Sequence, residues 1–209
     1  MKTSRSIFDA VARLLTFGIA TALLLGGTYS FTKDKIATQQ ELAAQRLYGQ
    51  LIATDSYTNN LNETAIAMPE FLASVTHNES SVLLATKDNE LVAALIPSDA
   101  LDGYSGRIKL LMAIDKQGHL LAVRVLAHRE TPGLGDAIEV SKSDWIFSFD
   151  DLAYSLEDRD SWDVAKYGGN FDQFTGATVT PRAVVRQVER TLNAIAAEAI
   201  WLEELQNYE

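Results

Sequence analysis

Residues 172–182 read Asp-Gln-Phe-Thr-Gly-Ala-Thr-Val-Thr-Pro-Arg, and they decide how the C-terminal half of the chain is interpreted. The stretch places the hydroxyl of Thr178 on a short Gly-Ala turn before a predicted helix over 183–205. Pro181 suits the first helical position, where its missing N–H costs nothing, and Thr180 suits the N-cap. Because a helix N-terminus offers unpaired N–H groups, a phosphate near Thr178 would be stabilised. A plain turn with a helix cap remains the alternative.

The pattern Asp-x-x-(Ser/Thr)-Gly-Ala-Thr resembles the flavinylation site of the FMN-binding domain family. In that family FMN is joined through its phosphate to the hydroxyl of the last threonine. The resemblance implies that Thr178 bears a covalent FMN, with Thr175, Gly176 and Ala177 completing the motif after Asp172. It also implies a dedicated flavin transferase that draws on FAD, because a threonine hydroxyl is a poor nucleophile at neutral pH.

A second segment, residues 127–136, contains a Glu-Thr-Pro-Gly-Leu-Gly run that resembles the other signature of the same family. Segments 102–106, 143–146 and 168–172 are similar to the G subunit of the Rnf (Rsx) electron transport complex. The C subunit of the sodium-pumping NADH:quinone reductase shares both signatures, but it is a longer chain. The resemblance implies an electron-carrier subunit, without turnover of its own, in a bacterial inner-membrane complex that couples electron transfer to ion translocation.

The second signature is also the candidate contact of the flavin ring. Its glycines let the backbone approach closely, a leucine can cover a ring face, and a threonine can hydrogen-bond the polar edge. The residues predicted to pack against the ring are Glu130, Thr131, Gly133, Leu134 and Gly135. A rigid turn that braces two sheets is the alternative interpretation.

Four other residues near the signatures have two interpretations each. Arg182 either pairs with the phosphate or is a solvated arginine of the first helical turn. Trp145 and Tyr104 either stack on flavin or belong to the core, which is the commoner place for such aromatics. Asp172 either positions the transferase or the phosphate-bearing turn, or it is an ordinary Asx-turn residue.

Residues 14–31 form an uncharged run long enough to cross a bilayer, about 27 Å as a helix. Three basic residues precede the run, and two lysines with an aspartate between them follow it. This bias favours a cytoplasmic N-terminus and a periplasmic C-terminal part. A cleaved signal peptide and a buried core helix are the alternatives; the first conflicts with the length of the run and the lack of an Ala-x-Ala site, and the second with its apolar character on all faces.

Composition excludes several classes of function. The chain has no cysteine, so disulfides and cysteine-ligated metals are excluded, and redox chemistry requires a bound non-metal cofactor. His77, His119 and His128 lack ligand spacing, so no metal site is expected. Residues 36–209 hold 13 basic and 26 acidic side chains, a formal charge of about −13. This charge argues against nucleic-acid partners and against electrostatic adhesion to anionic lipid.

The periodicity of the chain predicts an α+β protein, with a transmembrane helix followed by one domain of antiparallel strands packed with helices. Hairpins are expected over 81–96 and 107–126, with one buried sheet face, and a short helix after Ser143-Asp144. An apolar stripe marks the C-terminal helix as core. The expected divisions are a cytoplasmic N-terminus (1–13), a signal-anchor (14–35), a stalk helix and linker (36–80) and the FMN-binding domain (81–209). A membrane-anchored interaction domain without flavin is the alternative function.

Overall fold

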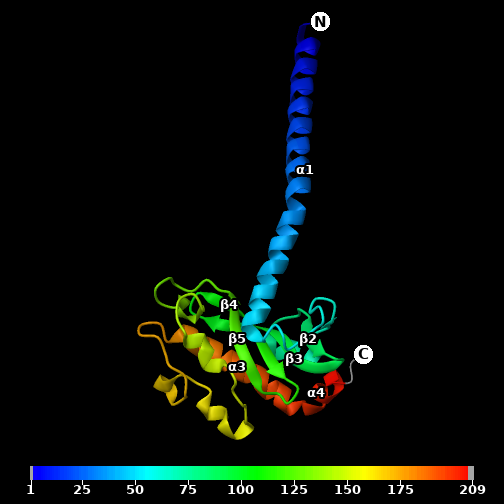
Figure 1. The fold of residues 1–209 in the computed structure, drawn as a ribbon. Helices are drawn as coiled ribbons and strands as arrows, with labels where there is room; N and C mark the ends of the chain where they lie inside the picture. The colour runs from blue at the N-terminus through cyan, green and yellow to red at the C-terminus, as the bar shows by residue number, and fades with distance from the viewer. Residues whose placement is uncertain (1, 207–209) are drawn as a thin grey trace. The chain divides into compact units, whose positions relative to one another are not determined.

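A computed structural model describes the backbone of residues 2–206 and the side chains of residues 13–205, except those of 34, 37, 40 and 199. The chain divides into two compact units, 1–46 and 47–209. Helix α1 (Lys2–Leu51) runs unbroken through the predicted anchor and stalk (Figure 1). Within it, Arg13–Lys33 is long and apolar enough to cross a membrane. The side chains of Lys2 and Arg5, used to predict orientation, lie outside those described.

A five-stranded antiparallel meander forms the centre of the second unit, in the order β1-β2-β3-β4-β5. The strands are β1 (Ala65–Ile66), β2 (Val82–Lys87), β3 (Glu90–Gly103), β4 (Gly106–Asp115) and β5 (Leu120–Ala127). Asp88 and Asn89 have positive φ angles of 53° and 64° at the β2–β3 turn, as a tight two-residue hairpin requires. Strand β3 runs beyond its predicted end, through Pro97, and pairs with β4 along that extension. The two predicted hairpins are therefore parts of one sheet.

Both faces of the sheet are buried, whereas the sequence predicted only one. The predicted face, with Leu110, Met112 and Ile114, packs against the C-terminal helices. The opposite face includes Leu111 and Ala113, which join a second apolar cluster under the end of α1 and the segment after it. Strict alternation along β4 therefore separates two cores rather than a core from solvent.

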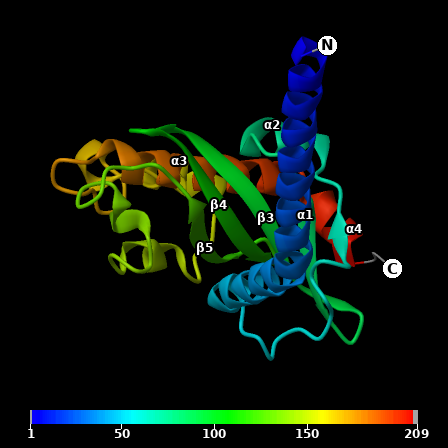
Figure 2. The same ribbon diagram turned by 90° about the horizontal axis from the view of Figure 1, so that it is seen from above.

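Helix α3 (Val179–Ala197) lies along the first face of the sheet, and α4 (Ala199–Gln206) follows it (Figure 2). The prediction of one helix over 183–205, capped at Thr180, is wrong in two respects: the helix begins at Val179, and it breaks at Glu198. The break redirects the chain so that Trp201 packs edge-on against Phe71 of helix α2 (Glu70–Thr76), with ring centroids 5.6 Å apart. Tertiary packing thus overrides good local helix propensity.

The segment from Asp136 to Phe171 covers the remaining part of this face with short turns of 3-10 helix. These are η1 (Asp136–Ile138), η2 (Trp145–Phe149), η3 (Leu156–Ser161) and η4 (Ala165–Tyr167). Helix η2 confirms the predicted short helix after Asp144. Phe149 and Phe171 stack at 4.6 Å between ring centroids, so aromatic packing holds a segment that has little regular structure.

Candidate functional site

The two signature segments meet at one cavity of about 320 Å³. The loop after β5 contributes Glu130, Thr131, Leu134 and Gly135, and the turn before α3 contributes Gly176, Ala177 and Thr178; Tyr104, Val179 and Thr180 complete the wall. A Cβ built on Gly176 would lie 3.9 Å from Leu134 Cδ2, so the two segments approach closely. Thr175 and Gly133 do not line this cavity. The structure thus brings together seven of the nine predicted site residues.

Glu130 is a buried carboxylate that joins three segments. Its Oε1 accepts the Ser105 N–H at 2.9 Å, and its Oε2 accepts the hydroxyl of Thr180. Two glycines leave room for it: a Cβ on Gly103 would lie 2.9 Å from Oε1, and one on Gly135 would lie 3.0 Å from Oε2. Glu130 therefore braces the cavity wall, which makes the predicted direct role toward a flavin secondary to this structural one.

Thr180 does not cap α3, contrary to prediction. Val179 is the first helical residue, and the N-cap is Thr178, whose side chain makes no capping hydrogen bond. Pro181 is accordingly the third helical residue rather than the first. Thr180 is 1 % exposed and gives its hydroxyl to Glu130 instead. The sequence placed the cap two residues late because Thr178 and Thr180 are equally good capping residues and only burial separates them.

The loop of residues 130–135 is held by its own backbone. The N–H groups of Leu134 and Gly135 donate to the Thr131 carbonyl at 3.1 and 3.0 Å. Gly133 has a φ of 77°, and its N–H donates to the Asp136 carboxylate at 2.7 Å. Because the turn is fixed in this way, Leu134 stands at the cavity with 47 % of its surface exposed. An exposed leucine on a rigid turn is free to contact a ligand.

His128 fixes the start of the same loop. Its Nδ1 accepts the Glu130 N–H at 3.0 Å, so the proton lies on Nε2, which donates to Glu139 at 2.6 Å. This hydrogen bond holds the pKa of Glu139 below its ordinary value. His128 is thus a positioning residue, and no three His, Asp or Glu side chains among those described lie close enough to hold a metal ion.

The turn that carries Thr178 is braced from the opposite side by Trp145. The Trp145 indole N–H donates to the Asp172 carbonyl at 2.8 Å, and its ring meets Phe174 edge-on, with centroids 5.2 Å apart. Gly176 has a φ of 81°, which favours glycine, and the Ala177 N–H closes the turn on the Phe174 carbonyl. Trp145 is therefore a structural aromatic, while the Asp172 side chain is exposed.

Thr178 stands between the first cavity and a second one of about 430 Å³, and it lines both. The second cavity, which we call the cationic cavity, is lined by Asp102, Lys166, Tyr167, Thr178, Val179, Arg182, Ala183, Arg186 and Arg190. Arg182 is paired with Asp163 through its Nε at 2.9 Å, and 40 % of its side chain remains exposed, so its pairing with a phosphate stays a prediction. Burial would raise the pKa of the Asp163 carboxyl, but the hydrogen bonds from Arg182 and from the Val164 N–H hold it below its ordinary value.

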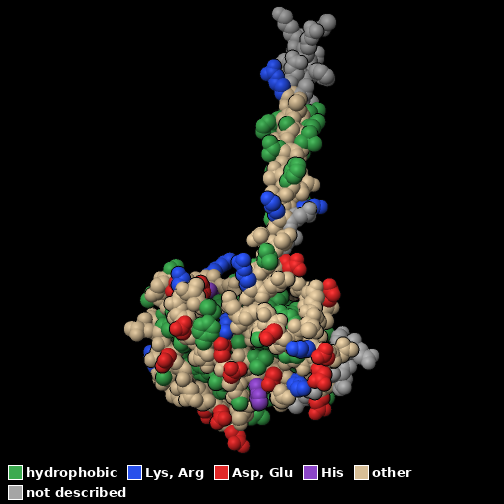
Figure 3. Space-filling view, viewed as in Figure 1, with side chains coloured by type: hydrophobic (Ala, Val, Ile, Leu, Met, Phe, Trp, Pro, Cys, Tyr) green, Lys and Arg blue, Asp and Glu red, His purple; other side chains and the backbone are tan. Residues whose placement is uncertain are grey.

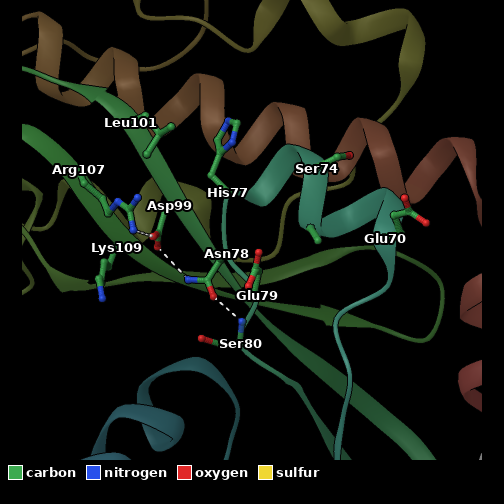
Figure 4. A pocket seen from close by; sticks show the side chains of 11 residues that line it. Glu70, Ser74, His77, Asn78, Glu79, Ser80, Asp99, Leu101, Arg107 and Lys109 are labelled. Carbon is green, nitrogen blue, oxygen red and sulfur yellow. Dashed lines mark hydrogen bonds and ion pairs between the residues drawn. The ribbon is translucent and has the colours of Figure 1, made fainter.

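A third cavity, of about 940 Å³ and thus larger than these two, contains none of the predicted site residues (Figure 4). It is an open hollow between α2 and the ends of β3 and β4. Its one buried charge, Asp99, is already paired, because Asn78 donates to it at 3.0 Å and Arg107 at 3.1 Å. Size alone therefore does not indicate the functional site.

Comparisons with known proteins bear on the two signature segments. Acidic side chains are scattered over the visible face of the second unit (Figure 3). A family model described as the FMN-binding domain matches residues 103–193, which span both signature segments. The fold and the site thus define an FMN-binding domain. A second model, the RnfG N-terminal region, matches residues 1–51.

Relatives along most of the chain identify the family. The G subunit of the ion-translocating oxidoreductase complex of Shewanella amazonensis is 46 % identical over 171 residues, covering 81 % of this chain and 80 % of that one. Its namesake in Escherichia coli O157:H7 is 42 % identical over 179 residues, covering 85 % of each. The chain belongs to this family, the G subunits of ion-translocating oxidoreductase complexes. The crystal structure of Shewanella oneidensis NqrC is similar over 75 % of both chains, with a TM-score of 0.46 and 19 % identity.

Proposed function

We propose that this chain carries FMN joined through its phosphate to Thr178, and that it passes electrons between other subunits of an Rnf-type, ion-translocating complex. The observation that carries the proposal is the convergence of the two signature segments at one cavity with the Thr178 hydroxyl on its rim. That hydroxyl makes no capping bond, so attachment would sacrifice no interaction of the helix. A family match to FMN-binding domains supports the identity of the cofactor.

The cavity wall suits the ring of a tethered flavin. Its volume is at the lower end of the range for small-molecule sites, which hold apolar surface and a few polar groups. Leu134 supplies an apolar contact, and Thr131 supplies a hydroxyl on the same rigid turn. A phosphate tether leaves the isoalloxazine unmodified, so contacts with the protein tune its potential. Leu134→Ala should shift the reduction potential of the bound flavin, and an unchanged potential would remove Leu134 from the ring contacts.

Attachment needs a transferase with its own donor. The Thr178 Oγ–P bond forms as the P–O bond of the FAD pyrophosphate breaks, AMP leaves with the electron pair, and the hydroxyl proton goes to a base of the transferase. The described part of the chain has no constellation that would activate Thr178. This chain is proposed as an electron carrier that does not catalyse a reaction without the other subunits.

The segment Arg13–Lys33 is proposed as a single membrane anchor with the second unit on the periplasmic side of the bacterial inner membrane. Support comes from the excess of positive charge before the segment. The absence of cysteine allows a clean test, because one cysteine introduced at the exposed Ser141 would be unique. An impermeant maleimide should label Ser141→Cys in intact spheroplasts. Labelling only after lysis would show that the second unit lies on the cytoplasmic side instead.

Denaturing electrophoresis tests the flavin assignment. Full-length protein co-expressed with a flavin transferase should give a fluorescent band that survives denaturation, and intact mass should show one added FMN. Thr178→Val should abolish both signals, because it removes the hydroxyl at nearly constant volume, whereas Thr178→Ser should retain them. A dark wild-type band would instead support the second candidate, a flavin-free interaction subunit, and a fluorescent Thr178→Val band would exclude this acceptor.

A further inference from the structure

The cationic cavity concentrates positive charge in an otherwise acidic part of the chain. Four basic side chains line it, against the single carboxylate of Asp102. Residues 36–209 contain 26 acidic and 13 basic side chains, so nearly a third of their cations face one cavity. The four are Lys166, Arg182, Arg186 and Arg190. Such a concentration of cations attracts anions locally, although the domain as a whole is acidic.

Helix geometry puts Thr178 at the head of this row. Residues 178, 182, 186 and 190 are spaced by four, and side chains at this spacing lie on one face of a helix. The Arg182 N–H donates to the Thr178 carbonyl at 3.3 Å, so the row begins at the N-cap. A phosphate on Thr178 would therefore lie beside the first arginine of the row and near the helix N-terminus.

Arg182 is held ready for an anion. Its Nε and Nη2 each donate to the Asp163 carboxylate at 2.9 Å, and its Cζ lies 3.8 Å from the centroid of the Tyr167 ring. Among the described residues, Nη1 has no hydrogen-bond partner. The guanidinium is thus clamped along one edge and stacked on one face, while the N–H groups of Nη1 remain available.

Gly168 and Gly169 allow a tight loop to pack against Asp163, the residue that holds Arg182. Val164 and Phe171 form a bridge that closes the segment between them into a tight loop, and Gly168 turns it with a φ of 90°. A Cβ on Gly169 would overlap the carbonyl group of Asp163 and lie 2.6 Å from its Cα. Only glycine at 169 therefore lets the loop pack against Asp163.

The next two arginines differ in how firmly they are engaged. Arg190 donates to Asp102 at 3.1 Å, whereas Arg186 makes no hydrogen bond or ion pair with the described residues. Arg186 is also half-buried, which strengthens its attraction for an anion relative to a fully solvated charge. Arg182 is thus pre-oriented. Arg186 forms no ion pair among those residues, although it lies near enough to Asp163 to help lower the pKa of that carboxyl.

We propose that the cationic cavity is an anion subsite for the phosphate group of the flavin at Thr178, with Arg182 and Arg186 as its principal ligands. The proposal rests on the proposed function. A phosphodiester at Thr178 keeps one negative charge, and arginine binds phosphate oxygens through charge-assisted hydrogen bonds. The two cavities then divide the flavin: the ring enters the first cavity, and the phosphate faces the second.

Binding of two free flavins isolates the contribution of the phosphate. Full-length Thr178→Ala in neutral detergent leaves space for an untethered phosphate, and riboflavin differs from FMN only in lacking that group. FMN should bind at least about tenfold more tightly than riboflavin. Arg186→Gln, added to Thr178→Ala, should reduce this ratio to below about threefold, with the riboflavin affinity unchanged. Lys116→Gln removes one charge from the turn between β4 and β5, and it should leave the ratio intact.

Equal affinities for the two flavins, or failure of both to bind, would overturn the subsite. The fluorescent band of wild-type protein on a denaturing gel is independent of this ratio, so it reports attachment alone. A lipid phosphate is the competing source of the same chemistry. If acidic phosphatidylglycerol vesicles retain Thr178→Ala better than the variant that also carries Arg186→Gln, while the FMN-to-riboflavin ratio is the same in both, the anion is a headgroup and the proposal is wrong.

Discussion

Substitution of Gly169 by alanine should be far more destabilising than the same change at its neighbour. At Gly169 the added Cβ would meet backbone atoms, the carbonyl group and Cα of Asp163. That backbone cannot swing aside easily, because the Asp163 carboxylate is held by Arg182 in two hydrogen bonds. Overpacking costs about 1–3 kcal/mol when side chains can adjust. We therefore expect Gly169→Ala to lose about 3 kcal/mol or more.

Gly168→Ala is the matched control. Its φ of 90° disfavours alanine, but nothing lies within 4 Å of the added Cβ. The cost should be that of the left-handed backbone alone, about 1–2 kcal/mol. The difference between the two variants, at least about 1–2 kcal/mol, isolates the close approach to Asp163.

Tryptophan fluorescence during urea denaturation would measure both variants in the full-length, detergent-solubilised protein. All three tryptophans, Trp145, Trp162 and Trp201, lie in the second unit, so the apolar segment of α1 does not contribute to the signal. Trp162 is buried beside the loop itself. Equal midpoints and slopes for the two variants would show that the loop does not pack on Asp163, and Arg182 would then lack the clamp that orients it.

The remaining predictions concern two buried contacts. Thr180→Val removes a hydroxyl bonded to the carboxylate of Glu130, which should cost about 2 kcal/mol and lower Tm by about 4–8 °C; the exposed Thr175→Val is the control, and equal Tm values would refute the contact. Asp163 has a pKa below its ordinary 3.8, so its pairing with Arg182 stabilises the fold above that value and is lost as pH falls through the lower folded-state pKa. As the pH is lowered below 3.8, the free energy of unfolding should therefore decrease more steeply for wild type than for Asp163→Asn. Parallel plots of this free energy against pH for the two proteins would contradict the pairing.

Much of the architecture follows from local pattern. Alternation along β4 predicted which residues share one buried face of the sheet, because strand side chains alternate strictly between faces. The uncharged run of residues 14–31 predicted the long apolar helix, because only a helix satisfies its own backbone in such a run. The turns in the two signature segments could be predicted because glycine, proline and capping residues act on the nearest few residues.

The local sequence pattern did not predict the features that depend on contacts between residues distant in the sequence. The extension of β3 through Pro97 is set by its partner strand, and the break at Glu198 is set by the fit of Trp201 against Phe71. Neither partner is near in sequence. The opposite sheet face also reads as a modestly apolar surface until the end of α1 is placed over it.

Neighbouring residues are enough to predict an apolar helix, antiparallel strands and two glycine-rich segments, the second with a threonine before a helix. The partners of the polar side chains in those segments depend on the folded chain. Thr180 gives its hydroxyl to Glu130 rather than capping α3, and Arg182 is clamped by Asp163 beside Thr178. A buried polar side chain forms hydrogen bonds with the groups that lie close to it, and the folded chain determines which groups those are.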